Sequence, residues 1–461
     1  MSTTRTEKDS LGEVQVPADA LWGPQTQRAI NNFPVALRPL PLDFIHGVVR
    51  VKRCAAASNQ ALGLLDPARA QAIEQACDQI LSGAHGDQFP VDVYQTGSGT
   101  STNMNVNEVL ATLASRMSPE PVNANDHVNM SQSSNDVIPT AIHVSAWLAV
   151  RDQVVPAIEH LMGVIADREA DSADVVKTGR THLMDAMPVT LAQELKTWRL
   201  QLHSARDRIQ GAAEGLLPVP QGGTAVGTGI NAHREFASRF AQSLSELCNS
   251  AFSPMEHPFT GQSAVDAPLA LSSQLRGLGA VLMKIANDLR WMNSGPIHGL
   301  GEITLPALQP GSSIMPGKVN PVIPESVAMV SAQLTGLDSA INTAAQSGNF
   351  QLNVMLPLVA NNLLEMTGLV SRVMVLLADQ AISGMTVNQE VMAEAVGRNP
   401  VLVTALNPVI GYAKAAEVAK KAYATGQSIL DVAAAETEVP RETLEQLLDP
   451  IKLTRGGLPE A

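Results

Sequence analysis

The chain has 461 residues, 45% of them hydrophobic, which is enough for a sizeable core or for several domains. Its net charge of −13, from 31 basic and 44 acidic residues, argues against nucleic acid and anionic membrane surfaces as partners. Charged residues make up only 16%, well below the ~25% of an average soluble protein, so we expect much of the surface to be buried in an oligomer.

The N-terminal segment "MSTTRTEKDS" has no apolar core of the kind that a secretory leader needs. No later apolar run is long enough to span a membrane. These features predict a cytoplasmic protein. Residues 1–130 are expected to form an N-terminal domain in which shorter helices alternate with loops.

From about residue 131 the apolar residues recur with helical spacing over long stretches, and strand-type alternation is hard to find anywhere. Residues 131–384 are predicted to form a central domain of five long helices. The segment "SGMTVN" at 383–388 marks the boundary to a small helical C-terminal domain, residues 385–461. The predicted fold is therefore mainly α, with a long bundle between two end domains.

The long helices carry recognisable start signals. The first has an apolar stripe from Ile138 to Ile165, and Pro156 is predicted to kink it. The second opens with Thr190 and Gln193, which have the spacing of a capping box. The other three are expected to begin near Asp266, at Pro321 and near Asn353.

Two polar interruptions precede predicted helices. In "QTGSGTSTNMNVNE" (95–108), Ser98 and Thr100 place hydroxyls beside free N–H groups at a helix start, which suits a carboxylate, although ordinary capping is an alternative. The segment lacks the GxGxxG spacing of a dinucleotide site. "SQSSND" (131–136) offers Ser133, Ser134 and Asn135 as donors, and here capping is the simpler interpretation.

A third interruption, "GRTHLMDAMP" (179–188), contains His182 just before the second long helix. None of the ten histidines has a metal-site spacing, and Cys54, Cys77 and Cys248 lie too far apart in sequence to suggest a cluster. We therefore expect free thiols in a reducing compartment and neither metal nor cofactor. If His182 is functional, it acts as an acid or base near neutral pH; a structural histidine is the alternative.

The segment "GSSIMPGKVNP" (311–321) is unlike the rest of the chain. It is not a phosphate-binding P-loop, because five residues separate Gly311 from Gly317 and Val319 follows Lys318 where Ser or Thr would be needed. A plain linker between two helices remains one interpretation. The other is a lid that closes over a small anion and excludes water, with glycines as its hinges.

In the lid interpretation, the polar residues of this segment are positioned to contact the bound anion. Ser312 and Ser313 lie near one end, and Lys318 and Asn320 near the other. Glu325 lies about one helical turn beyond Asn320, where its carboxylate can orient a histidine.

The loop resembles the signature segment of the fumarase/aspartase superfamily, and its closest likeness is to class II fumarases. Other resembling motifs occur in order along nearly the whole chain: "EKDSLGEVQVPADALWGPQTQRAINNFP", "TGSGTSTNMNVNEVL", "SQSSND", "GRTHLMDAMPVTLAQE", "QGGTAVGTGIN", "KIANDLRWMNSGP" and "NPVLVTALNPVIGY". The resemblance implies the three-domain fold of that superfamily and a homotetramer with twenty central helices. It also implies active sites that are each shared by three subunits, and reversible, stereospecific hydration of fumarate to L-malate in the tricarboxylic acid cycle.

The resemblance also implies roles for single residues. Ser312 matches the general base, and His182 paired with Glu325 matches the group on the hydroxyl or water side. The residues that match substrate-carboxylate contacts are Ser98, Thr100, Asn135, Thr181, Lys318 and Asn320, with Ser133, Ser134 and Ser313 as further candidates.

Some positions depart from the family pattern. Asn123, Ala124, Asn125 and Asp126 stand where many class II fumarases have His-Pro-Asn-Asp at a secondary anion site, so we expect weak binding there. Pro24 replaces an alanine and Gln351 replaces a glutamate, with no role predicted for either.

Two alternative functions remain open at this point. One is aspartase, which releases ammonia from aspartate and is suggested by the last residues of "KVNPVIPE", although "GRTHLMDAMP" and "GGTAVGTGIN" look more like fumarase. The other is an inactive structural oligomer. The intact set Ser312, His182, Lys318 and Glu325 argues against it.

Overall fold

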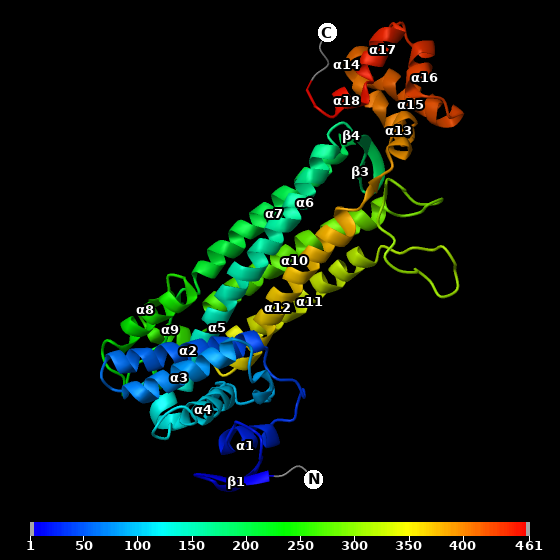
Figure 1. Cartoon of the computed structure of the whole chain (residues 1–461). Coiled ribbons are helices and arrows are strands. Elements are labelled where there is room, and N and C mark those ends of the chain that lie inside the picture. Colours follow the sequence, from blue (N-terminus) through cyan, green and yellow to red (C-terminus); the bar gives the residue numbers. More distant parts are fainter. Residues whose placement is uncertain (1–3, 458–461) are drawn as a thin grey trace. The chain divides into compact units, whose positions relative to one another are not determined.

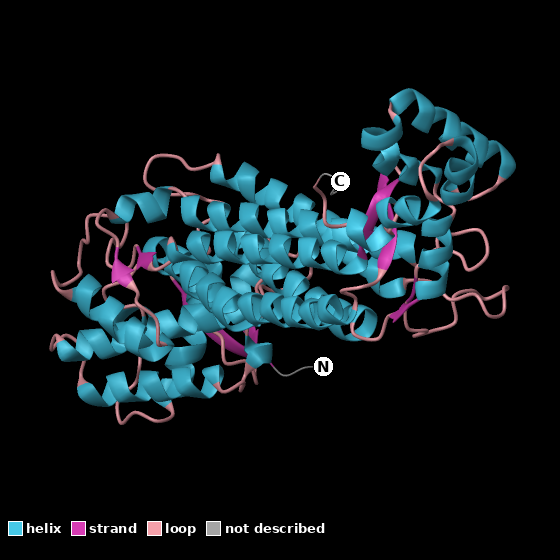
Figure 2. Cartoon of the chain, turned by 90° about the horizontal axis from the view of Figure 1, so that it is seen from above, coloured by secondary structure: helices cyan, strands magenta, loops and turns pink. Residues whose placement is uncertain are grey.

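The computed structural model describes residues 4–457. Residues 1–3 and 458–461 lie outside this range. They belong to the first and last of the three predicted domains, and residues 1–3 also belong to the segment in which no secretory leader was predicted. Helices dominate the described chain (Figure 2), which confirms the mainly α prediction. No helix in this range is both long and apolar enough to cross a membrane.

The chain divides into two compact units. Unit 1 comprises the described residues up to Pro156 together with Ala205–Gly279 and Val330–Ser371. Unit 2 comprises Ala157–Ser204, Ala280–Met329 and the described residues from Arg372 onward. The three-domain division of the sequence stays a prediction.

Five long helices agree closely with the predicted ones (Figure 1). Thr190 and Gln193 form the expected capping box: the Thr190 N–H donates to Gln193 Oε1 (3.0 Å), and the Gln193 N–H donates to Thr190 Oγ1 (3.1 Å). The five helices are α6 (Val155–Asp171), α7 (Leu191–Glu214), α10 (Asp266–Met292), α11 (Val322–Ala345) and α12 (Leu356–Leu377).

The first long helix is distorted just before Pro156. Helix α5 (Ser134–Ala149) continues through a π-helical turn, η3 (Val150–Val154), directly into α6. Proline has no N–H to donate to the preceding turn, and its ring crowds the carbonyl there, so the backbone widens N-terminal to it. The predicted kink is thus a local widening, and the apolar stripe continues across it with Ile138 and Ile165 both buried.

Unit 1 opens with a hairpin that strand-type alternation in the sequence did not reveal. Strands β1 (Thr4–Asp9) and β2 (Gly12–Pro17) pair antiparallel. The residues of β1, "TRTEKD", include no apolar side chain, so hydrophobic periodicity could not detect the strand. The expectation of helices and loops alone in this region is corrected accordingly.

The rest of unit 1 is helical apart from one short parallel pair, β5 (Pro218–Val219) with β6 (Ser253–Pro254). Pro24 is the first residue of α1, a position where its missing N–H has no helical partner to lose. Nothing in the structure explains Gln351. The remaining elements are α1 (Pro24–Asn32), α2 (Leu42–Ala61), α3 (Pro67–Leu81), η1 (Gly86–Gln88), α4 (Thr100–Ser115), η2 (Ala124–Val128), α8 (Phe236–Cys248) and α9 (Pro258–Ser263).

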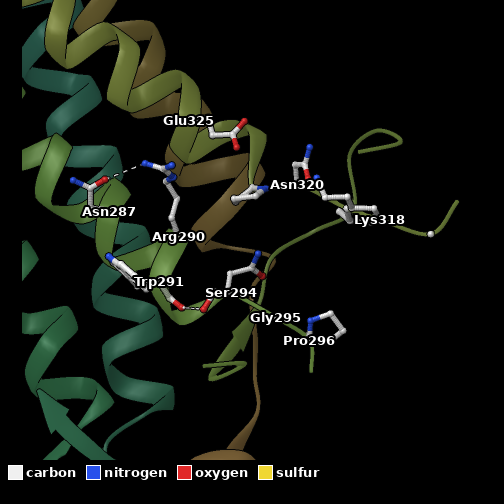
Figure 3. Close-up of a pocket in the computed structure, with 13 residues that line it drawn as sticks. Asn287, Arg290, Trp291, Ser294, Gly295, Pro296, Lys318, Asn320 and Glu325 are labelled. Carbon is white, nitrogen blue, oxygen red and sulfur yellow. Dashed lines mark hydrogen bonds between the residues drawn. The ribbon is translucent and has the colours of Figure 1, made fainter. Parts of the chain in front are cut away.

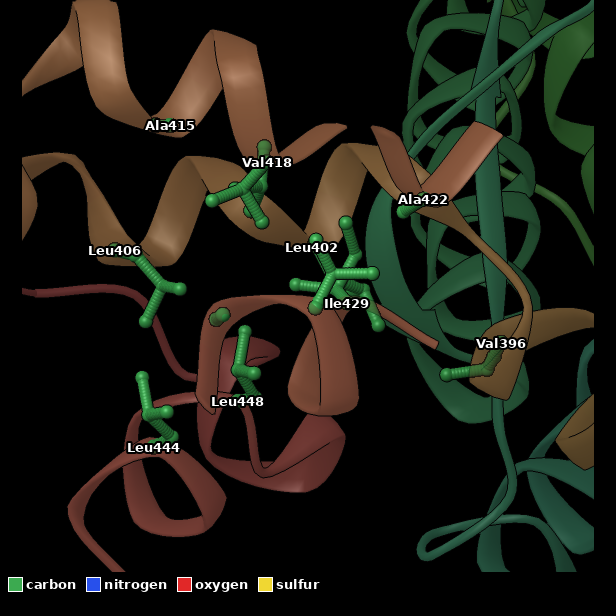
Figure 4. Packing of buried hydrophobic residues seen from close by; sticks show 12 residues of the cluster. Val396, Leu402, Leu406, Ala415, Val418, Ala422, Ile429, Leu444 and Leu448 are labelled. Carbon is green, nitrogen blue, oxygen red and sulfur yellow. The ribbon is translucent and has the colours of Figure 1, made fainter. Parts of the chain in front are cut away.

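Unit 2 contains two strand pairs and a cluster of short helices. Strands β3 (Val176–Thr181) and β4 (Met184–Thr190) form a hairpin, and β7 (Ile303–Thr304) pairs with β8 (Thr386–Val387). Buried Leu402, Leu406, Val418, Ile429 and Leu444 hold the short helices together (Figure 4). Those helices are α13 (Gln389–Gly397), η5 (Pro400–Leu406), α14 (Asn407–Ile410), α15 (Tyr412–Thr425), α16 (Ile429–Glu436), α17 (Arg441–Leu447) and α18 (Pro450–Leu453). The π-helical turn η4 (Ala378–Ile382) follows α12 directly.

Candidate active site

The start of α4 presents the first pair of candidate hydroxyls. Ser98 Oγ and Thr100 Oγ1 lie 2.8 Å apart and share a hydrogen bond. The N-cap residue is Gly99, which has φ of 73° and no side chain, and the Thr100 N–H at the start of α4 donates weakly to Ser98 Oγ (3.4 Å). The glycine also permits close packing, because a Cβ at this position would lie 2.9 Å from Ile138 in α5.

The start of α5 meets the start of α4 through this contact. Ser133 is the N-cap of α5, and its N–H donates to Asp136 Oδ1 in a capping box, so capping accounts for Ser133. Ser134 Oγ accepts a hydrogen bond from Asn103 Nδ2, and Asn135 Nδ2 donates to the carbonyl of Ala225. The starts of α4 and α5 are therefore linked in unit 1 by packing and by the hydrogen bond between Asn103 and Ser134.

Asp136 fixes a third segment beside these helix starts. Its Oδ2 accepts N–H groups from Gly222 (3.0 Å) and Thr224 (2.8 Å) of the "QGGTAVGTGIN" motif. Burial raises the pKa of Asp136 to about 6, although hydrogen bonds from Ser133, Thr224 and Gly222 oppose that rise. Sequence reasoning assigned no role to this buried carboxyl.

In unit 2, Thr181 and His182 lie at the tip of a hairpin rather than in the loop that the sequence predicted. Thr181 pairs with Met184, and His182 and Leu183 form the two-residue turn with φ of 57° and 61°. Both residues having positive φ is the geometry of a tight hairpin turn. Strand β3 has one apolar side chain, Val176, and the apolar residues of β4 do not alternate regularly with polar ones, which is why the sequence pattern resembled a loop. The tip is exposed.

Buried charges anchor the base of the same hairpin. Lys177 Nζ lies 2.7 Å from carboxylate oxygens of both Glu194 and Glu302. Arg180 Nη1 lies 2.8 Å from the other oxygen of Glu302. The hairpin is thus held to α7 and to the residue preceding β7, while His182 at its tip makes no hydrogen bond within the described chain.

The 311–321 segment is a closed loop whose two ends are tied together. The Gly311 N–H donates to the Lys318 carbonyl (2.8 Å), and Asn320 Nδ2 donates to the Gly311 carbonyl (2.7 Å). A Cβ on Gly311 would lie 2.3 Å from the Lys318 oxygen, so only glycine allows this approach. Gly317 has φ of 82° and reverses the chain.

Ser312 lies at the start of this loop with its hydroxyl oxygen facing two donors. The N–H groups of Ile314 and Met315 donate to Ser312 Oγ at 3.2 and 3.1 Å. Such donors stabilise negative charge on the oxygen that accepts them. Ser313 and the following residues of the loop are exposed.

A hollow of about 540 Å³ in unit 2 brings together three predicted residues, Lys318, Asn320 and Glu325 (Figure 3). A second hollow of about 470 Å³ is lined by Ser312, Met315 and Lys318, so Lys318 borders both. Thr181 and His182 line neither of these hollows. His182 and Glu325 form no ion pair within residues 4–457 of a single chain.

Sequence reasoning missed the α10 side of the larger hollow. Arg290 Nη1 donates to Asn287 Oδ1 (3.2 Å), and Trp291, Asn293 and Ser294 complete that wall. These residues fall in "KIANDLRWMNSGP", a segment recognised as a motif but given no site residue. The motif itself was the only available signal.

The doubtful secondary anion site lies in η2. Asn123 is the N-cap, and its Oδ1 accepts the N–H groups of Asn125 (2.8 Å) and Asp126 (2.9 Å). These donors are occupied by the protein itself and are not available to an anion. Asn123, Ala124 and Asn125 border a hollow of about 670 Å³, and weak anion binding there stays a prediction.

Comparison with known protein families defines the class first. A family model described as a lyase matches residues 12–336, and one described as the fumarase C C-terminus matches residues 402–455. The first match covers most of the chain and places the fold among the lyases. The second narrows that class to the fumarases.

Individual relatives identify which class of fumarase the chain resembles. Fumarate hydratase class II 2 of Pseudomonas aeruginosa is 56% identical, covering 99% of this chain and 100% of that protein. Fumarate hydratase class II of Xylella fastidiosa (strain 9a5c) is 54% identical, covering 98% of this chain and 96% of that protein. The crystal structure of class II fumarase from Schistosoma mansoni matches with a TM-score of 0.95 and 36% identity, covering 98% of this chain and 99% of that one. The chain belongs to the class II fumarate hydratase family of the fumarase/aspartase superfamily.

Proposed function

We propose that the chain catalyses the reversible, stereospecific hydration of fumarate to L-malate. The observation that carries the proposal is the environment of Ser312, whose Oγ accepts two backbone N–H groups inside a loop that also presents Lys318 and Asn320. Relatives 54% to 56% identical over nearly the whole chain are named fumarate hydratase class II, which supports this substrate.

Ser312 is proposed as the general base. In the direction from malate to fumarate, its deprotonated Oγ removes a proton from the carbon beside one carboxylate. The electron pair of that C–H bond moves into the carboxylate and forms a doubly charged aci-carboxylate. Serine is a poor base in water, and the two N–H donors lower the cost of forming its oxyanion. We propose that the loop excludes solvent when it closes over the substrate.

Lys318 and Asn320 are proposed to stabilise the charge that develops on that carboxylate. Both line the hollow of about 540 Å³ in unit 2, and Asn320 is held in place by its hydrogen bond to Gly311. One preorganised donor of this kind contributes on the order of 10²- to 10³-fold in rate. The carboxylates are bound by Ser98, Thr100, Ser133, Ser134, Asn135, Thr181 and Ser313.

The second half of the reaction breaks the C–O bond. The electron pair of the aci-carboxylate returns to form the C=C bond, and the hydroxyl leaves with one added proton as water. His182 is proposed to supply that proton with Glu325 as its partner. Since the two residues are not bonded within one chain, we propose that different subunits contribute them.

Assembly into a homotetramer, with each active site shared by three subunits, completes the proposal. Four of the long helices expose a large apolar side chain that a second copy would cover. They are Leu200 (52% exposed), Trp291 (53%), Met329 (68%) and Leu376 (42%). We further propose that the enzyme acts in the cytoplasm, in the tricarboxylic acid cycle.

Elimination of ammonia from aspartate is the alternative activity, because the same loop chemistry serves both reactions. The test is the ultraviolet absorbance of fumarate formed by the purified chain from L-malate and, separately, from L-aspartate. We expect absorbance to rise with L-malate. Turnover of L-aspartate alone would replace the hydratase proposal with the ammonia-lyase one, and turnover of neither would favour an inactive structural oligomer.

A further inference from the structure

Lys52 is a buried cationic residue that the proposed mechanism does not use. It lies in α2, which packs against α3, α4 and α5 in unit 1 (Figure 1), and its side chain has no exposed surface. Its Nζ donates to Asn129 Oδ1 (2.8 Å) and to Gln132 Oε1 (3.0 Å). Both acceptors are neutral amides, and within residues 4–457 Lys52 forms no ion pair.

Asn129 links Lys52 to the helix that begins with the Ser98 and Thr100 hydroxyls. Its Oδ1 accepts hydrogen bonds from Asn103 and Asn107 of α4, each at 3.2 Å, in addition to the one from Lys52. Three donors thus converge on one oxygen. Any shift of Asn129 would therefore disturb α2 and α4 together.

The same network reaches the start of α5. Asn103 Nδ2 also donates to Ser134 Oγ (3.0 Å), and Asn129 Nδ2 donates to the Gln132 carbonyl (3.2 Å). Two turns beyond Lys52 on α2, Asn59 binds the Met130 carbonyl and the Ser131 hydroxyl. Helix α2 therefore holds residues 129–134 at several points immediately before Ser134 and Asn135.

A buried lysine without a carboxylate partner is costly to the stability of a protein. An apolar side chain of similar size would avoid that cost. Lys52 instead contacts the segment that precedes α5. Hydrogen bonds through Asn129 and Asn103 connect its charge to Ser134, which is proposed to bind the substrate dianion.

We propose that Lys52 is a positioning residue for substrate binding, which holds the starts of α4 and α5 as one carboxylate-binding surface and supplies positive charge beneath it. The inference rests on the proposed hydration of fumarate. It concerns the affinity for the dicarboxylate rather than the proton-transfer step. Its clearest signature is therefore a rise in KM with a smaller change in kcat.

The protonation of Lys52 gives a second signature. Burial lowers the pKa of Lys52 to about 7, and the negative charge of Asp136 from α5 opposes that fall. The Cys77 thiol of α3 also faces Lys52, and burial raises the pKa of that thiol well above its usual range. Helix α4 and residues 129–132 face it with amides alone. As the pH rises through this pKa, Lys52 loses its positive charge, so the affinity for a dianion falls and KM increases.

The experiment compares Lys52→Met with wild type and with Arg53→Met from about pH 6 to about pH 9. Arg53 is the matched control, because it is a cation on the same helix that binds Asp78 and Glu74 of α3 instead. We expect Lys52→Met to raise KM for fumarate and L-malate by about tenfold or more and to abolish the alkaline rise in KM. Arg53→Met is expected to retain the wild-type KM and its pH dependence.

Gln132→Glu provides a test that does not depend on the folding of Lys52→Met. A carboxylate beside Nζ raises the pKa of Lys52, so the rise in KM should move to higher pH. Calorimetric titration with L-malate applies the same comparison to binding. Wild-type KM, L-malate affinity and pH dependence in both variants would overturn the role of Lys52, whereas the absence of hydration by the wild type would overturn the proposed function instead.

Discussion

The role proposed for Ser312 as a base requires that its oxyanion be stabilised, and two backbone N–H groups of its own loop donate to Ser312 Oγ. The two donors are the backbone N–H groups of Ile314 and Met315. The side chains of these two residues are exposed. The contribution proposed for these residues therefore comes from their backbone N–H groups, which a side-chain pattern cannot reveal. The sequence could place a serine in a glycine-bounded loop, but the donors to its oxygen depend on the loop conformation.

Replacing Ser312 with alanine tests its role. Because the variant keeps the backbone and loses the proton acceptor, we expect kcat for fumarate hydration to fall by about 10²- to 10⁴-fold. Ser313→Ala is the neighbouring comparison and is expected to have a smaller effect, since Ser313 is a candidate for binding alone. Rates are measured by the loss of fumarate absorbance, with helix content compared by circular dichroism. Full turnover by Ser312→Ala would show that another group is the base.

Among the elements, helices with strong local signals were predicted correctly. The Thr190 and Gln193 spacing predicted the capping box of α7, and Pro321 directly precedes α11. The hairpins were missed for a physical reason: β1 has no apolar side chain, β3 has only Val176, and the apolar residues of β4 do not alternate regularly with polar ones. Their pairing depends on cross-strand hydrogen bonds. His182 was therefore identified as a candidate, but its place at a hairpin tip was not.

The 311–321 loop is the element on which the proposed chemistry depends most. Gly311→Ala would force a Cβ to within 2.3 Å of the Lys318 carbonyl and separate the two ends of the loop. Misplacement of reacting groups by about 1 Å can cost roughly 100-fold in rate, so we expect a loss of kcat of about that size. Gly397→Ala in α13 is the control, because a Cβ there meets nothing within 4 Å. Wild-type kcat in Gly311→Ala would contradict the proposed lid.

At the scale of the whole molecule, the low charge content predicted an oligomer, and the exposed apolar side chains on α7, α10, α11 and α12 support one. The chain has a mass of 48.7 kDa, so light scattering of a homotetramer should give about four times that value. A monomeric chain with full activity would refute both the tetramer and the sharing of sites between subunits.

The candidate site could be predicted only in part, because its assembly depends on contacts between segments that are distant in the sequence. Recognised motifs identified residues of both units, and Lys318, Asn320 and Glu325 do border one hollow. Arg290 and Lys52 were missed because their positions depend on how distant helices pack, which no local pattern records. In the proposed tetramer, His182 and Glu325 would come from different copies of the chain.

The most direct test of the proposed activity is the change in fumarate absorbance when the purified chain is given L-malate or L-aspartate in parallel. Reversible hydration predicts that fumarate accumulates from L-malate to a fixed equilibrium, and that the same equilibrium is reached when the reaction starts from fumarate. Fumarate formation from L-aspartate, with none from L-malate, would contradict the proposed function.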